Sequence, residues 1–194
     1  ISILPKADKL LARKPAFTLD QFKPIARFTA DPTVLVVRAD APWKTLSEFV
    51  ADLKTQPGRY NYGSSGNYGT MHVPMEMLKT SAGFRMTHIP YKGTGPGVVD
   101  TLAGHRQMMV AAVAAAMGHV KSGRLRGLAV SSPKRLSALP DMPTVMESGY
   151  KYEVNNWHGV IAPKGVPRAI IDKLNGEINR AIKDPGFAAR IASD

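Results

Sequence analysis

The chain has 194 residues, of which 44% are hydrophobic and 21% charged, and its formal net charge is +11. Such a composition is ordinary for a globular protein of one or two domains with a substantial core. Lysine and arginine are scattered without a long basic block, so we attribute the charge to solvated faces and general attraction of anions rather than to nucleic-acid binding. The absence of cysteine excludes a disulfide framework, thiol catalysis and thiolate metal sites.

The first part of the chain predicts a lead-in, a strand and a helix. Residues 1–24 are expected to be irregular, because several prolines interrupt any long element. Residues 34–38 are a continuous β-branched and apolar run, which is typical of a strand buried on both faces. An apolar stripe from Leu46 to Leu53, preceded by a capping box from Thr45 to Glu48, indicates a helix.

Two similar strand-loop-helix units follow. A short strand at residues 59–62 runs into a Gly/Ser loop at 63–70, after which a helix is expected. A second strand at 86–90 runs into a glycine loop at 91–97, and a helix with an apolar start follows directly. This order indicates βαβ units and a mainly parallel sheet, in which ligands bind beyond the carboxyl ends of the strands.

Both loops suit the binding of an anion. Backbone N–H groups at a helix start lack partners within the helix, and the helix dipole adds positive charge there, so a carboxylate or phosphate can bind with few charged side chains. The hydroxyl and amide groups that could add hydrogen bonds are those of Ser64, Ser65, Asn67, Thr70 and Thr94. The alternative is that these residues only cap their own helices and that the loops only connect elements.

The remaining elements continue the α/β pattern. Strands are predicted at residues 108–113, 125–130 and 157–162. A second capping box spans Thr144 to Glu147, and a helix with one apolar stripe begins at Pro167. The sequence therefore predicts an α/β fold.

Motifs for catalysis and for cofactors are missing from the sequence. The five histidines never fall at metal-ligand spacing, and Ser64 and Ser65 are not in a nucleophile elbow. Neither glycine loop matches a P-loop or a dinucleotide fingerprint. We therefore expect no metal, no cofactor and no catalytic residues, and we interpret the loops as a binding site for a small anion, with an enzyme as the weaker alternative.

Several longer motifs occur in order across nearly the whole chain. They are Leu35-Val-Val, Pro57-Gly-Arg-Tyr-Asn-Tyr-Gly-Ser-Ser-Gly66, His88-Ile-Pro-Tyr-Lys-Gly93, Gly123-Arg-Leu-Arg-Gly-Leu-Ala-Val-Ser131, Leu139-Pro-Asp-Met-Pro-Thr-Val145 and Ala162-Pro163. Together they resemble the Bug (TctC-like) family, the periplasmic substrate-binding receptors of tripartite tricarboxylate transporters.

The resemblance implies a type II periplasmic binding protein fold, in which two α/β lobes joined by crossing strands close on a small organic carboxylate. Residues 1–33 would be the tail of lobe one, 34–130 a complete lobe two, and 131–194 a partial return to lobe one. It also implies a periplasmic location, a signal peptide in the precursor and delivery of the ligand to membrane permease subunits. The alternative role is that of a ligand-sensing accessory protein of a sensor kinase.

The resemblance also implies which residues contact the ligand. The expected contacts are Ser64, Ser65, Gly66, Asn67 and Thr70 in the first loop, Thr94, Gly95, Pro96 and Gly97 in the second, and Trp157, beside Asn155 and Asn156, on the cleft wall of lobe one.

Two departures from the family pattern lead to further expectations. The chain looks truncated at both ends, and a half-built lobe one would expose apolar surface, so we expect the chain to associate or to need a missing segment. Residues 111–116 are apolar where the family commonly has an acidic or amide residue. The groove should therefore favour a dicarboxylate or a bulkier, aromatic carboxylate over an amino-acid-like ligand, because no side chain there would pair with an ammonium group.

Overall fold

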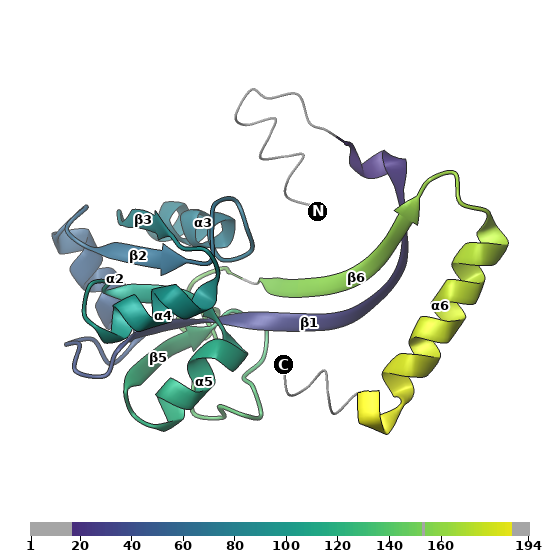
Figure 1. Cartoon of the computed structure of the whole chain (residues 1–194). Helices are drawn as coiled ribbons and strands as arrows, with labels where there is room; N and C mark the ends of the chain where they lie inside the picture. The colour runs from purple at the N-terminus through teal and green to yellow at the C-terminus, as the bar shows by residue number, and fades with distance from the viewer. Residues whose placement is uncertain (1–16, 153, 188–194) are drawn as a thin grey trace. The chain divides into compact units, whose positions relative to one another are not determined.

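A computed structural model describes residues 17–152 and 154–187 (Figure 1). The chain divides into two compact units, one comprising Ile1–Ala30 with Asn156–Asp194 and the other Asp31–Asn155. The part of the expected lead-in at residues 1–16 lies outside the described residues, as does the segment 188–194.

The larger unit contains most of a mixed sheet with the strand order β3-β2-β4-β1-β5. These strands are β1 (Phe22–Arg38), β2 (Asn61–Ser64), β3 (Thr87–Pro90), β4 (Met108–Ala112) and β5 (Leu125–Val130). β2 runs parallel to β3 and β4, whereas β1 runs antiparallel to both β4 and β5. The expected mainly parallel sheet is thus present, with β1 as the strand of opposite direction.

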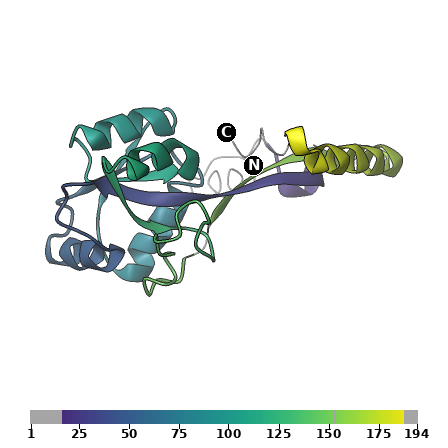
Figure 2. The ribbon, with the colours of Figure 1, turned by 90° about the horizontal axis from the view of Figure 1, so that it is seen from below.

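Helices cover both faces of this sheet (Figure 2). α2 (Leu46–Thr55) and α3 (Val73–Ala82) pack on one face, and α4 (Thr94–Leu102) and α5 (Val113–Lys121) pack on the other. Leu35 and Val37 of β1 belong to the first core, and Val34 and Val36 belong to the second. The prediction of a strand buried on both faces is confirmed, because successive side chains of a strand point to opposite faces.

β1 is much longer than the expected strand at residues 34–38. It begins at Phe22, directly after the short 3-10 helix η1 (Leu19–Gln21), and it includes Pro24 and Pro32. The prediction that residues up to 24 are irregular is therefore wrong from Leu19 onward. Prolines argue against a strand in the sequence because they have no backbone N–H to donate to a neighbouring strand. A strand nevertheless tolerates a proline at a position where no such N–H is needed.

The two capping boxes have different outcomes. At α2, Glu48 N–H donates to Thr45 Oγ1 (3.1 Å) and Lys44 N–H donates to the Glu48 carboxylate (2.7 Å), so the predicted helix start is confirmed. The Thr144 and Glu147 side chains also bond each other's backbone N–H groups, at 3.0 and 2.7 Å. There the segment forms turns and not a helix, which shows that the motif can close a turn by itself.

Residues 131–155 belong to the larger unit. The assignment of residues 34–130 and 131–194 to two lobes, which the family resemblance implies, stays a prediction. Backbone hydrogen bonds explain why residues 131–155 group with the larger unit. Ser131 N–H donates to Thr33 O (2.9 Å), and Val145 N–H donates to Val130 O (2.9 Å). The segment after β5 therefore continues along the sheet edge before the chain leaves this unit.

The smaller unit contains the first part of β1, most of β6 (Asn155–Pro163), which pairs with β1, and α6 (Arg168–Lys183). The strand expected at 157–162 and the helix expected after Pro167 are confirmed. Their core is small and is formed by Ile25, Ala162 and Ile171. The apolar stripe of α6 is only partly covered, since Ile170 and Leu174 are 49% and 41% exposed.

Candidate functional site

The two predicted loops meet because their strands end at the same edge of the sheet. The register pairs Ser64, the last residue of β2, with Pro90, the last residue of β3. β4 runs parallel to β2 beside it and ends at Ala112. The segments that follow these strands therefore lie at the carboxyl edge, where α/β sheets bind ligands.

Hydrogen bonds join the two loops directly. Tyr91 N–H donates to Ser64 O (2.9 Å), and Gly93 N–H donates to Ser65 O (3.2 Å). Gly66 has φ 146° and Gly93 has φ 99°, backbone conformations that residues with a Cβ rarely adopt. The glycines thus allow the close approach of the two loops.

The second loop is shorter than predicted. Gly93 is the N-cap of α4, so Thr94, Gly95, Pro96 and Gly97 form the first turn of the helix and not a loop. Proline is well tolerated in a first helical turn, because its missing N–H would have no partner inside the helix. Among the residues that the structure describes, no side chain caps this helix start.

Two of the predicted contact residues have structural roles. Ser64 is buried, and its hydroxyl donates to Gly66 O (2.8 Å), accepts from Gly66 N–H (3.3 Å) and lies 2.7 Å from His88 Nε2. Gly97 is buried against β4, where a Cβ would lie 2.6 Å from Met109 Cε. Ser64 therefore shapes the first loop, and Gly97 allows α4 to approach the sheet.

The other predicted residues of the larger unit are at least partly accessible to solvent: Ser65, Gly66, Asn67, Thr70, Thr94, Gly95 and Pro96. Trp157 lies on β6 in the smaller unit, is 43% exposed and lines a hollow with Ile25, Val160 and Asn175. The assignment of these ten residues to one ligand site stays a prediction.

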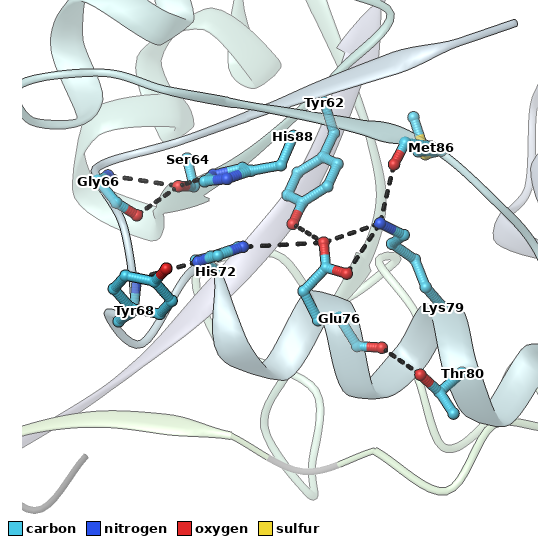
Figure 3. A network of polar contacts seen from close by, with 10 residues as sticks. All are labelled: Tyr62, Ser64, Gly66, Tyr68, His72, Glu76, Lys79, Thr80, Met86 and His88. Carbon is cyan, nitrogen blue, oxygen red and sulfur yellow. Dashed lines mark hydrogen bonds and ion pairs between the residues drawn. The ribbon is translucent and has the colours of Figure 1, made fainter. Parts of the chain in front are cut away.

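A polar network behind the first loop was not predicted from the sequence (Figure 3). Tyr62 of β2 donates to Glu76 Oε1 of α3 (2.6 Å), and Lys79 donates to both Glu76 oxygens at 2.8 and 2.9 Å. Burial by itself would raise the pKa of Glu76, but the hydrogen bonds from Lys79 and Tyr62 outweigh it and lower that pKa. The carboxylate is therefore held in its charged form.

Two stacked histidines connect this network to the loop. The rings of His72 and His88 have centroids 3.7 Å apart and planes 9° from parallel. Burial lowers the pKa of His72, and burial together with the charge of His72 lowers the pKa of His88 to about 4. Sequence reasoning tested these histidines only as metal ligands. The strands that became β2 and β3 were expected to lie in one sheet, and their pairing places His88 beside Tyr62. This pairing was the sequence signal from which the position of His88 could have been predicted.

A third helix begins at the same edge. α5 follows β4 without a loop, with Ala112 as its N-cap, and the described residues supply no side-chain cap. Ala114 and Ala115 in its first turn are exposed, whereas Ala111 and Ala116 are buried. The alanine-rich run therefore presents backbone N–H groups of a helix start, whereas the sequence predicted only a less polar groove at residues 111–116.

A separate hollow of about 730 Å³ lies at the opposite end of the sheet. It is lined by Ala39, which follows β1, and by Leu125, which begins β5. Its Arg126 guanidinium already donates to backbone carbonyls of Ala39, Ala41 and Trp43 at 2.6 to 2.9 Å. This hollow is therefore distinct from the predicted site at the carboxyl edge.

Within residues 17–152 and 154–187, no group of three or more His, Cys, Asp or Glu side chains is arranged to hold a metal ion. In the same part of the chain, no helix has the length and apolar character needed to span a bilayer.

The model of the family described as "Tripartite tricarboxylate transporter family receptor" matches residues 6–194. A UPF0065 protein of a Pseudomonas species is 35% identical over 84% of this chain and 49% of its own length. Protein BugT of Bordetella pertussis is 31% identical over 95% of this chain and 57% of its own length. The chain thus spans about half the length of these curated relatives.

Solved structures resemble the chain across both units. MatC from Rhodopseudomonas palustris, with bound malate, has a TM-score of 0.82 and 28% identity, covering 96% of this chain and 64% of MatC. Another R. palustris protein, solved with adipate, has a TM-score of 0.80 and 27% identity over 92% of this chain and 60% of its own. Such likenesses confirm the expected α/β type II periplasmic binding protein fold.

Proposed function

Because the chain belongs to the receptor family of tripartite tricarboxylate transporters, we propose that it is an extracytoplasmic solute receptor that binds a small organic carboxylate. Receptors of this kind bind and release their ligand unchanged, so we expect no turnover. The whole receptor's ligand and partners are part of this proposal, since the chain spans about half of its curated relatives.

The observation that carries the proposal is the pair of hydrogen-bonded loops at the carboxyl edge. The bonds from Tyr91 to Ser64 and from Gly93 to Ser65 bring the first loop beside the first turn of α4. The first N–H groups of that turn have no partner within the helix, and the helix dipole favours an anion there. Gly95 leaves this helix start open, because a Cβ at this position would have no atom within 4 Å.

The ligand class follows from the chemistry of the same edge. The first turn of α5 offers backbone N–H groups and the side chains of Val113, Ala114 and Ala115, none of which can pair with an ammonium group. MatC is described with bound malate and the other R. palustris protein with adipate, which supports a dicarboxylate. We propose that a dicarboxylate or an aromatic carboxylate binds more tightly than an amino acid.

The proposed partners are the membrane permease subunits of such a transporter, to which the receptor would deliver its ligand in the periplasm. The family description supports this partnership, and a similar structure described as a periplasmic transporter supports the location. We also propose that the chain as given associates through its smaller unit, where Ile170 and Leu174 of α6 are partly exposed.

Calorimetric titration and thermal-shift assays with adipate, malate, benzoate and aspartate test the ligand class. A carboxylate present at 100 times its Kd should add about 2.7 kcal/mol to the free energy of unfolding. Failure of all four ligands to bind would contradict the receptor proposal for this chain. Tighter binding of aspartate than of adipate and benzoate would overturn the proposed preference, and chemical change of a bound ligand would revive the enzyme alternative.

Two substitutions at Gly95 test the role of the helix start. Gly95→Ala and Gly95→Pro both add a Cβ in open space, but only proline removes the backbone N–H. We expect Gly95→Pro to weaken adipate binding by roughly tenfold, the size of one hydrogen bond to a charged group, and Gly95→Ala to change it little. Equal affinities of the two variants would show that this N–H does not contact the ligand.

A further inference from the structure

One ring nitrogen of His72 holds the backbone of the first loop. Tyr68 N–H donates to His72 Nδ1 (2.9 Å), so this nitrogen uses its lone pair as an acceptor and carries no proton. The other nitrogen, Nε2, faces Glu76 Oε1 at 3.8 Å. Proton uptake by the ring must therefore occur at Nδ1, and it would remove the acceptor that Tyr68 uses.

The backbone conformation of Tyr68 depends on this hydrogen bond more than that of an ordinary loop residue would. Its φ is 59°, and it is the only non-glycine residue with positive φ in the described part of the chain. A bulky side chain is rarely found in this left-handed region, so the surroundings must hold it there. The His72 ring also lies against the Tyr68 ring, with centroids 5.6 Å apart. Loss of the hydrogen bond would thus release the strained centre of the loop at residues 65–70.

His88 fixes the other end of the same loop. Ser64 has one hydroxyl proton, which it donates to Gly66 O, so His88 Nε2–H donates to Ser64 Oγ. The stacked rings of His72 and His88 then connect Ser64 and Tyr68 from behind. This arrangement satisfies every contact when both rings are neutral (Figure 3).

The charged and titratable groups around His72 come from three elements. Glu76 and Lys79 of α3 act in opposite directions, since the carboxylate favours a charged ring and the ammonium disfavours it. Lys79 also bonds both Glu76 oxygens, and Tyr62 of β2 donates to one of them, so this carboxylate is already neutralised in part. His88 of β3 stacks on the ring and disfavours a second positive charge.

We propose that His72 is a positioning residue for carboxylate binding, whose neutral ring holds Tyr68 and the loop at residues 65–70, so that proton uptake by His72 weakens the binding. The proposal rests on the proposed function, because it concerns the same loop. A bound carboxylate and a protonated His72 would also attract each other. Loss of the loop's conformation nevertheless weakens carboxylate binding by more than this attraction strengthens it.

The experiment measures adipate binding by calorimetry at pH 7.5, 6.5 and 5.5 for wild type and His72→Asn. Asparagine Oδ1 can replace Nδ1 as the acceptor for Tyr68 N–H, but it takes up no proton in this range. Each variant is compared with wild type at the same pH, because adipate itself titrates toward the lower end. We expect the affinity of wild type to fall about threefold or more relative to His72→Asn between pH 7.5 and 5.5. His72→Ala, which removes the acceptor, should bind weakly at all three pH values.

His105→Asn is the matched control, since His105 is an exposed histidine that follows α4. It should keep the pH dependence of wild type. The proposal is overturned if wild type binds adipate equally well or better at pH 5.5 relative to His72→Asn, or if the two proteins have the same pH slope.

A measurement without ligand separates this proposal from the proposed function. NMR of protein labelled with ¹⁵N in histidine and tyrosine should show the Tyr68 amide and the His72 ring titrating with one common midpoint below pH 6.5. Independent midpoints would refute the coupling even if carboxylates bind. If no carboxylate binds at pH 7.5 but the midpoints coincide, the proposed function fails while the coupling between His72 and the loop stands.

Discussion

Gly97 in the first turn of α4 lies against Met109, the second residue of β4, so closely that a Cβ at Gly97 would be 2.6 Å from Met109 Cε and 2.7 Å from its Sδ. Tyr91 Cδ2 would be 3.1 Å from the same Cβ. The same Met109 Sδ would lie 2.7 Å from a Cβ at Gly63 of β2. The two glycines thus allow a methionine to fill the space between α4 and the sheet, directly behind the candidate site.

Gly97→Ala should destabilise the protein by about 1–3 kcal/mol, because the added methyl group overpacks this contact. Gly95→Ala is the control in the same helical turn. The Cβ that it adds has no atom within 4 Å. The free energy of unfolding should therefore stay unchanged or rise by a few tenths of a kcal/mol. Urea unfolding measures both. Equal stability of the two variants would mean that Met109 and Tyr91 move aside without cost.

The free energy of unfolding should fall as the pH is lowered from about 6.5 toward 4. Burial and the charge of His72 hold the pKa of His88 at about 4. An unfolded histidine titrates near 6.5, so the unfolded chain binds more protons in this window and acid favours unfolding. The contribution of His88 to the free energy of unfolding should be fully present above pH 6.5, and the free energy of unfolding should be lower by roughly 1–2 kcal/mol at pH 5.

His88→Gln checks the source of this pH dependence. The glutamine amide can donate to Ser64 Oγ in place of Nε2, but it does not titrate. Urea unfolding of wild type and variant at pH 7.5 and 5.0 should give a smaller difference for the variant. The assignment to His88 fails if both proteins lose the same free energy.

Ser131→Ala should cost about 1–3 kcal/mol, because it leaves a buried backbone donor unsatisfied. Ser131 Oγ accepts from Thr33 N–H (2.8 Å) and donates to Val154 O (2.6 Å), which joins β1 to the chain far beyond β5. Ser132→Ala removes only a local bond to Lys134 O and should cost less. Thermal unfolding compares the variants, and a similar loss in both would contradict the special role of Ser131.

Association of the chain should depend on the exposed face of α6. Light scattering at micromolar concentration should give wild type a molar mass above that of the monomer. The double substitution Ile170→Glu with Leu174→Glu should bring the molar mass closer to that of the monomer. Met77→Glu is the control, since Met77 is 65% exposed but lies on α3 in the larger unit. A monomeric wild type, or an equal effect of Met77→Glu, would contradict the proposal.

Much of the larger unit was predictable because its signals are local. The apolar run in β1, the box that starts α2 and the strands at 108–113 and 125–130 follow from side-chain periodicity and capping chemistry within a few residues. Element ends were less accurate. β2 begins and ends two residues later than expected, and α4 begins at Thr94, because glycine and proline in a first helical turn look like a loop in the sequence.

The sequence by itself determined the α/β order, the family motifs and the two segments where an anion could bind, since each depends on the residue types within a short stretch. Only the tertiary structure decided what Ser64, Gly97, His72 and His88 do. Ser64 and His88 are 24 residues apart in the chain, yet the parallel register of β2 and β3 brings them within hydrogen-bond distance. Strand pairing is a long-range choice that depends on burying both faces of the sheet, so no local pattern could reveal that the candidate loop is held by two stacked imidazole rings.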